Sequence, residues 1–285
     1  MKSRLGAALF FATTCACLAE EPKPAGSPPE GKWGALVATL ENGERGAEFK
    51  VQGTIKDLPD GVMLHVTLSV AGNFPVPIEA AFFQVKVVDG KYESRKAWDK
   101  KTLPPLTYWA RADLLMSKQH KTLRAELAQK YGWGYEHREQ VGLHAVSVGT
   151  PEENLAFRKE ALTRLREFVV KTRAIRDEAA AAIGKPKGED WAEVEKGLYA
   201  KLKACRAELT AYLAPRVVWH ESRLIEDVQS AHDRITLAVQ DHGKGKSTAA
   251  TEVSRVNDFL DAVLASIDGR LPTAEMPGGP IPGGK

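Results

Sequence analysis

The spacing of hydrophobic residues changes at residue 150 of this chain. Before that point, apolar and polar residues alternate in short runs, whereas beyond it apolar residues recur every three or four positions. Alternation is typical of strands with one buried face, and the longer spacing is typical of amphipathic helices. The sequence therefore predicts an α+β protein with a β half over residues 32–149 and a helical half over residues 150–271.

The β half is expected to contain six or seven short strands. Residues 58–61 (LPDG) suit a type I turn, and residues 89–90 (Asp-Gly) are typical of a type I′ hairpin. Short strands separated by regular turns indicate an antiparallel β-sandwich. The expected strands cover residues 35–40, 49–55, 62–70, 81–88, 106–116 and 141–149.

One helix is inserted before the last strand. Helical spacing over residues 117–130 predicts this helix, and residues 131–135 follow it as a loop. The last strand should then place Val141, Leu143 and Ala145 on one apolar face, because side chains of a strand alternate with a period of two.

Two turn and strand pairs in the β half carry a family resemblance. Residues 58–61 (LPDG) enter one strand, and residues 103–108 (LPPLTY) enter another. They resemble the LPDG and LPxGxY motifs of secreted bacterial immunoglobulin-like or transthyretin-like sandwich modules, although Leu106 stands where such modules usually have Gly. The resemblance covers only the β half. It implies an immunoglobulin-like β-sandwich with a binding, adhesive or spacer role, and it implies no catalytic residues.

The helical half begins with a clear N-terminal signal. Thr150 supplies a capping hydroxyl, Pro151 suits the first helical position, and Glu153 completes a capping box. Short connections between four amphipathic segments favour an antiparallel bundle or helical hairpins. The segments cover residues 151–183, 191–214, 217–238 and 253–267, with Asp190 as the expected cap of the second, and residues 272–285 are expected to be a disordered tail.

The N-terminus is expected to direct export. Lys2 and Arg4 precede a short apolar run, and Ala19 ends a small-residue motif, so we predict a signal peptide over residues 1–19. The mature chain is then periplasmic or secreted. A lipoprotein acylated at Cys17 is the alternative, and residues 20–31 form a Pro-rich linker in either case.

Composition narrows the functional classes. The chain has 285 residues, is 43% hydrophobic and carries a net charge of +3 without a basic cluster, which argues against nucleic-acid binding. No apolar run in the mature chain is long enough for a transmembrane helix. Once the signal is removed, Cys205 is the sole cysteine, so no intrachain disulfide is possible. Cys205 lies on an apolar seam and is expected to be an inert buried thiol.

Motifs for phosphate or metal binding are incomplete. Residues 243–247 (GKGKS) end like a phosphate-binding loop, but Gln240 stands where that loop requires Gly. The segment is better interpreted as a turn between helices, with Ser247 or Thr248 as the next cap. His220, His232 and His242 are spaced so that they face different sides of one helix, and no metal or cofactor is predicted. In the β half, three histidines are expected to be solvated on their strands: His65, His137 and His144.

The loop after the inserted helix is the candidate ligand-binding site. Its aromatic rings alternate with glycines beside titratable side chains, and exposed rings of this kind stack on sugars or peptides. The alternative is that Trp133 packs against the body of the protein. The candidate residues are Tyr131, Trp133, Tyr135, Glu136 and His137.

The sequence favours a non-enzymatic binding or structural protein of the cell envelope, with an envelope protein or glycan as its partner. One alternative is an enzyme acting on envelope polysaccharide or peptide, with Glu136 as acid or base. The other is a helical module that binds a partner while the sandwich acts as a spacer. That alternative predicts an apolar stripe left exposed on the packed helices. The sequence does not specify the oligomeric state.

Overall fold

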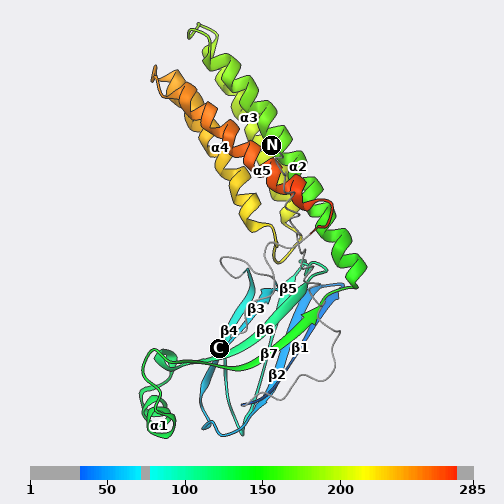
Figure 1. The fold of residues 1–285 in the computed structure, drawn as a ribbon, viewed down its shortest axis with the longest axis vertical. Coiled ribbons are helices and arrows are strands. Elements are labelled where there is room, and N and C mark those ends of the chain that lie inside the picture. The colour runs from blue at the N-terminus through cyan, green and yellow to red at the C-terminus, as the bar shows by residue number, and fades with distance from the viewer. Residues whose placement is uncertain (1–32, 72–77, 275–285) are drawn as a thin grey trace, which may run out of the picture.

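A computed structural model describes residues 33–71 and 78–274 (Figure 1). It confirms the α+β class, since the strands form two antiparallel sheets and four long helices follow them. The predicted signal peptide, the linker and residues 275–285 lie outside the described residues. The strands are β1 (Gly34–Gly43), β2 (Gly46–Ile55), β3 (Met63–Val70), β4 (Glu79–Lys86), β5 (Lys91–Asp99), β6 (Thr107–Leu115) and β7 (Arg138–Ser147). The helices are η1 (Met116–Lys118), α1 (Lys121–Tyr131), α2 (Pro151–Ile183), α3 (Trp191–Leu213), α4 (Ser222–Gly243) and α5 (Ala249–Arg270).

The two sheets share an apolar core. One has the strand order β1-β2-β5 and the other β4-β3-β6-β7. Leu64, Val66 and Leu68 of β3 are fully buried, in keeping with the predicted alternation. The ring of Phe49 on β2 lies 5.7 Å from the ring of Phe83 on β4, so the two sheets meet at this point.

The turn at Asp89 and Gly90 joins the two sheets. Both residues have positive φ, 50° and 66°, as a type I′ turn requires, and Val88 and Lys91 exchange two backbone hydrogen bonds. The strands separate directly after this bridge, because β4 pairs with β3 whereas β5 pairs with β2. Sequence analysis does not predict β5, since most of its side chains are polar and exposed and only Tyr92 is buried.

Because of a β-bulge, the side chains of β7 that face the core differ from those predicted. The β6–β7 register shifts between Ala112 and Asp113, which leaves Val141 as an extra residue. Val141 is buried whereas Leu143 is 41% exposed. The prediction that the two share a face is therefore wrong, because the inserted residue reverses the alternation.

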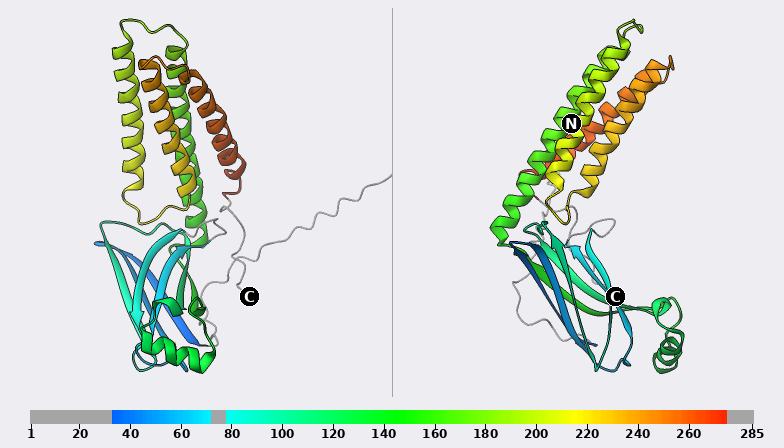
Figure 2. Two further views of the ribbon diagram at one scale, coloured as in Figure 1. Left: turned by 90° about the vertical axis from the view of Figure 1, so that its left-hand side faces the viewer. Right: turned by 180° about the vertical axis from the view of Figure 1, so that it is seen from behind.

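The four long helices pack side by side beyond one end of the sheets (Figure 2). Consecutive helices run in opposite directions, and α3 and α5 lie on opposite sides of α2 and α4. The predicted seams are buried, as Leu198, Leu202 and Leu209 of α3 illustrate. The large apolar residues left exposed on these helices are Val170 of α2 and Leu237 of α4. None of the described helices is both long and apolar enough to cross a membrane.

The helix starts confirm one predicted cap and correct two others. The Thr150 hydroxyl accepts from the Glu153 amide at 3.2 Å, and the Glu153 carboxylate accepts from the Thr150 amide at 2.7 Å, which completes the capping box. Asp190 and Thr248 precede α3 and α5, but their side chains make no capping hydrogen bond. The reason is conformational: their ψ angles of −1° and −18° differ from the extended backbone that capping requires.

The segment between α3 and α4 ties the helices to the β half. The third long helix is predicted from Val217, but α4 begins at Ser222. The Val217 amide instead donates to the Thr102 carbonyl at 2.9 Å, and the Thr102 amide donates to the Pro215 carbonyl at 2.9 Å. These hydrogen bonds form a short parallel bridge between Thr102 and Arg216.

The predicted tail starts with an ordered turn. Ala274 is fully buried, and its amide donates to the Arg270 carbonyl at 2.7 Å. Residues 272–274, which were expected to belong to the tail, therefore form a turn that packs against the helical half.

Candidate functional site

The end of α1 and the start of β7 position the five candidate residues. Helix α1 ends because Gly132 adopts a left-handed conformation with φ of 72°, and its amide donates to the Ala128 carbonyl. The chain then reverses toward β7. Of the five, Tyr131, Trp133 and His137 are partly buried, whereas Tyr135 and Glu136 are exposed.

The partly buried residues form a stack of rings. The ring centroids of Tyr131 and Trp133 lie 4.5 Å apart with nearly parallel planes, and those of Trp133 and His137 lie 4.6 Å apart at 15°. Trp33, just before β1, meets Tyr131 and Trp133 edge-on at 5.4 and 5.5 Å. Such pairs contribute about 0.5–1.5 kcal/mol each beyond the area they bury. Trp133 thus packs against the protein, as the alternative interpretation of this loop predicted.

Hydrogen bonds fix the stack to the sheets. The Trp33 indole N–H donates to Glu139 Oε1 at 2.6 Å, and Glu139 Oε2 lies 3.1 Å from His137 Nε2. On the other side, the Tyr131 hydroxyl and the Lys130 ammonium both donate to the Asp57 carbonyl. Sequence analysis does not predict Trp33 or Glu139, because neither belongs to the loop and no periodicity links them to it.

Tyr135 and Glu136 remain available to solvent. Tyr135 is 56% exposed, and the guanidinium of Arg124 lies 5.0 Å from its ring centroid. Glu136 is exposed, and it lines neither the hollow on the β1-β2-β5 sheet nor the hollow between the α2–α3 loop and the end of α4. An exposed carboxylate outside a cleft does not favour the proposed role as catalytic acid or base.

The histidines of the β half do not converge. His144 Nδ1 accepts from the Ala38 amide at 2.7 Å, and His137 belongs to the ring stack. His65 is buried on the outer face of β3 beside Phe82, which corrects the expectation that it is solvated. Within residues 33–71 and 78–274, no group of three His, Cys, Asp or Glu side chains is placed to hold a metal ion.

The helical half buries three polar groups near one another in its core. Thr172 of α2 contacts His232 of α4, with Oγ1 and Nε2 2.7 Å apart. Burial lowers the pKa of His232 to about 4, and burial raises the pKa of the Cys205 thiol on α3. A thiol with a raised pKa is a poor nucleophile, in keeping with the inert thiol expected at this position.

A second buried polar cluster lies at the ends of α4 and α5 that face the sheets. Arg270 donates to both carboxylate oxygens of Glu221, and both Glu221 and His220 are 2% exposed. Burial, followed by the charges of Arg270 and Arg158, lowers the pKa of His220 to about 3. Burial raises the pKa of Glu221, while Arg270 opposes this effect. The cluster therefore joins two helix ends through a desolvated ion pair beside a neutral imidazole.

An aromatic cage surrounds Arg216 at the same junction. Its guanidinium lies 4.7 Å from the ring centroid of Trp219, 5.1 Å from that of Tyr212 and 5.4 Å from that of Phe157. Each ring comes from a different segment: Phe157 from α2, Tyr212 from α3 and Trp219 from the link before α4. A delocalised cation stacked among three rings holds these segments together.

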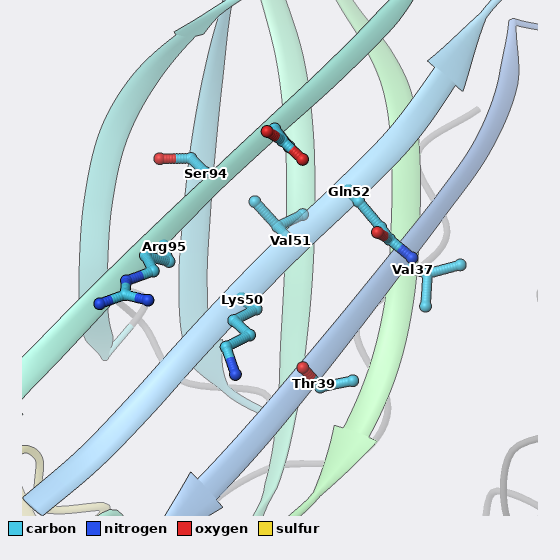
Figure 3. Close-up of a pocket in the computed structure, with 8 residues that line it drawn as sticks. Val37, Thr39, Lys50, Val51, Gln52, Ser94 and Arg95 are labelled. Atoms are coloured by element: carbon cyan, nitrogen blue, oxygen red, sulfur yellow. The ribbon is translucent and has the colours of Figure 1, made fainter.

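A shallow hollow of about 480 Å³ lies on the outer face of the β1-β2-β5 sheet (Figure 3). Lys50 of β2 and Arg95 of β5 are direct cross-strand neighbours there, which is an unfavourable arrangement for like charges. Glu48 offsets it, at 2.9 Å from Lys50 and 3.2 Å from Arg95. The lining residues are Val37, Thr39, Lys50, Val51, Gln52, Glu93, Ser94 and Arg95.

The chain was compared with protein-family models, with curated proteins and with solved structures, and none of these comparisons found a match.

Proposed function

We propose that this chain is an exported, non-enzymatic binding or structural component of the cell envelope, in which an immunoglobulin-like β-sandwich carries an antiparallel helical bundle. The sandwich would act as the base and the helices as a projecting arm. This proposal joins the export signal expected from residues 1–19 to the two-part architecture.

Two features of the β half support the immunoglobulin-like assignment. If β1 to β7 are labelled A, B, C, C′, E, F and G, the observed strand orders are ABE and C′CFG, which resemble the immunoglobulin arrangement. The buried Tyr108 near the start of β6 donates from its hydroxyl to the Pro104 carbonyl at 3.0 Å. This is the geometry of a tyrosine corner, which is typical of these folds.

The observation that carries the structural role is the cage around Arg216. Its three rings fix Arg216 to α2, α3 and the link before α4, and the backbone bridge between Arg216 and Thr102 joins this segment to the loop between β5 and β6. Helices that are held rigidly at this junction keep a fixed orientation relative to the β half, whereas helices attached through a flexible linker do not. Rigid attachment therefore suits a spacer or a presenting element.

Fractionation of the source cells tests export. The full-length chain with its own N-terminus should be recovered outside the cytoplasm, with an intact mass that corresponds to a start at Glu20. A mass that retains Met1, recovered only in the cytoplasm, would refute the proposal. A mass that corresponds to an acylated Cys17 start would replace the secreted form by the lipoprotein form.

Sugar binding by the aromatic loop is the second candidate, and the exposed ring of Tyr135 beside Arg124 favours it. A glycan array probed with the mature protein tests this candidate directly. Binding that falls in Tyr135→Ala and persists in a Glu126→Gln control on α1 would support it. An array with no signal above that of Tyr135→Ala or Trp133→Ala would end it.

A further inference from the structure

A hollow at the far end of the helices contains unpaired groups of three kinds. It measures about 730 Å³ and lies where the α2–α3 loop meets the end of α4, away from the sheets (Figure 2). The Lys187 ammonium donates to the Gly243 carbonyl at 2.6 Å and so joins its two walls. Its lining residues are Lys187, Gly188, Glu189, Trp191, Ala192, Glu195, Gln240, Gly243 and Lys244.

The indole N–H of Trp191 is the first unpaired group. Trp191 is 6% exposed, and its Nε1 has no hydrogen-bond partner among the described residues. Buried donors without a partner are rare in folded proteins and need an acceptor. The backbone of Gly243 lies beside this donor, since a Cβ at that position would lie 3.0 Å from Trp191 Nε1 and 3.5 Å from Glu195 Oε2.

The other unpaired groups carry opposite charges. Lys244 and Glu189 are both exposed and line the same hollow, yet neither has an ion-pair partner in the described part of the chain. Glu195 adds a second carboxylate, which the Tyr199 hydroxyl holds at 2.7 Å. The hollow thus presents cationic and N–H donor groups together with anionic groups that do not neutralise one another.

We infer that this hollow binds a small zwitterion of the amino-acid or short-peptide class, whose carboxylate meets the Trp191 N–H and Lys244 and whose ammonium meets Glu189 and Glu195. A charged acceptor satisfies the buried indole donor better than a neutral one. A ligand that carries both charges at opposite ends complements both sets of groups at once. The site is distinct from the aromatic loop and does not depend on where the protein is located.

The indole resonances of the six tryptophans in a ¹H–¹⁵N spectrum provide the readout. The Trp191→Phe spectrum identifies the Trp191 signal by its absence. Titration of the full chain with glycylglycine should shift this signal downfield and saturate. N-acetylglycylglycine and glycylglycine amide each lack one terminal charge and should bind at least fivefold more weakly. Equal binding of all three would overturn the zwitterion assignment, and no saturable shift with glycylglycine would overturn the site.

Gly243→Ala is the matched test of the geometry. It adds one methyl group beside the indole N–H within a helix, where Ala is better tolerated than Gly, so the fold should persist. Binding should fall at least tenfold. Gly197→Ala on α3 is the control, because no atom lies within 4 Å of the added Cβ there, and it should bind as the parent does. Unchanged binding in Gly243→Ala would place any ligand elsewhere and refute the proposal.

Discussion

His232 donates a hydrogen bond to Thr172 in the centre of the helical half. The Thr172 hydroxyl has a single proton, which it gives to the Phe168 carbonyl at 2.8 Å, so His232 Nε2, 2.7 Å away, must supply the proton between them. Since burial lowers its pKa to about 4, the imidazole is neutral at pH 7, with its single proton on Nε2. Nδ1 then has no partner among the described residues, so a second proton on the ring would be buried without an acceptor.

Acid should destabilise the helical half through this residue. Burial lowers the folded-state pKa of His232 from 6.5 to about 4, so the unfolded chain binds more protons between these values. Above pH 6.5 the neutral ring contributes its full stabilisation. As the pH falls from 6.5 to 4, the free energy of unfolding should decrease by about 3 kcal/mol. Urea unfolding followed by helical circular dichroism from pH 7 to pH 4 measures this loss.

A matched pair of variants isolates the His232 contribution. His232→Gln should show a flatter dependence of unfolding free energy on pH in that window. His120→Gln replaces an exposed histidine and should keep the parental slope. Identical slopes in the parent and in His232→Gln would contradict the assignment.

The ring stack predicts unequal costs for two aromatic substitutions in one loop. Trp133→Ala removes contacts with Trp33, Tyr131 and His137 and should cost about 2–4 kcal/mol. Tyr135→Ala removes an exposed ring and should change stability by less than about 1 kcal/mol. Chemical denaturation of both variants tests this difference, and similar costs would refute the packing role of Trp133.

Gly53 is required by the ring of Tyr92. A Cβ on Gly53 would lie 2.3 Å from Tyr92 Cζ and 2.6 Å from the Ala35 carbonyl oxygen, so either the ring or the strand must move. Gly53→Ala should therefore destabilise the β half by about 1–3 kcal/mol. Gly134→Ala, where no atom lies within 4 Å of the added Cβ, should be close to neutral. Thermal unfolding of both variants gives the comparison, and a neutral Gly53→Ala would contradict it.

The cage around Arg216 predicts that charge alone cannot maintain the junction. Arg216→Lys retains the cation but loses the planar group that stacks on Phe157, Tyr212 and Trp219. We expect a broader distribution of distances between spin labels on the β half and on α3, with little change in helix content. Arg223→Lys on the exposed start of α4 is the control. Unchanged distances in Arg216→Lys would show that the backbone bridge alone fixes the arm.

Local sequence signals predicted the helices better than the site. The bounds of α2 follow from Thr150, Pro151 and Glu153 at one end and from a Gly-rich turn at the other, and all of these signals are local. The ring stack instead joins Trp33 to residues about a hundred positions later in the chain. Neither hydrophobic periodicity nor motif spacing can predict a contact over that distance in sequence. The bulge at Val141 was missed for a related reason, since it is visible only in the pairing of β7 with β6.

The crossing turn at Asp89 and Gly90 has a consequence for the order in which the β half assembles. Because β5 leaves its hairpin neighbour and pairs with β2, that ladder joins residues between 37 and 53 positions apart. A chain that stops before Lys91 leaves one edge of β2 without its partner strand. Ribosome-bound or truncated forms of that length should expose this edge to other chains and aggregate until β5 emerges.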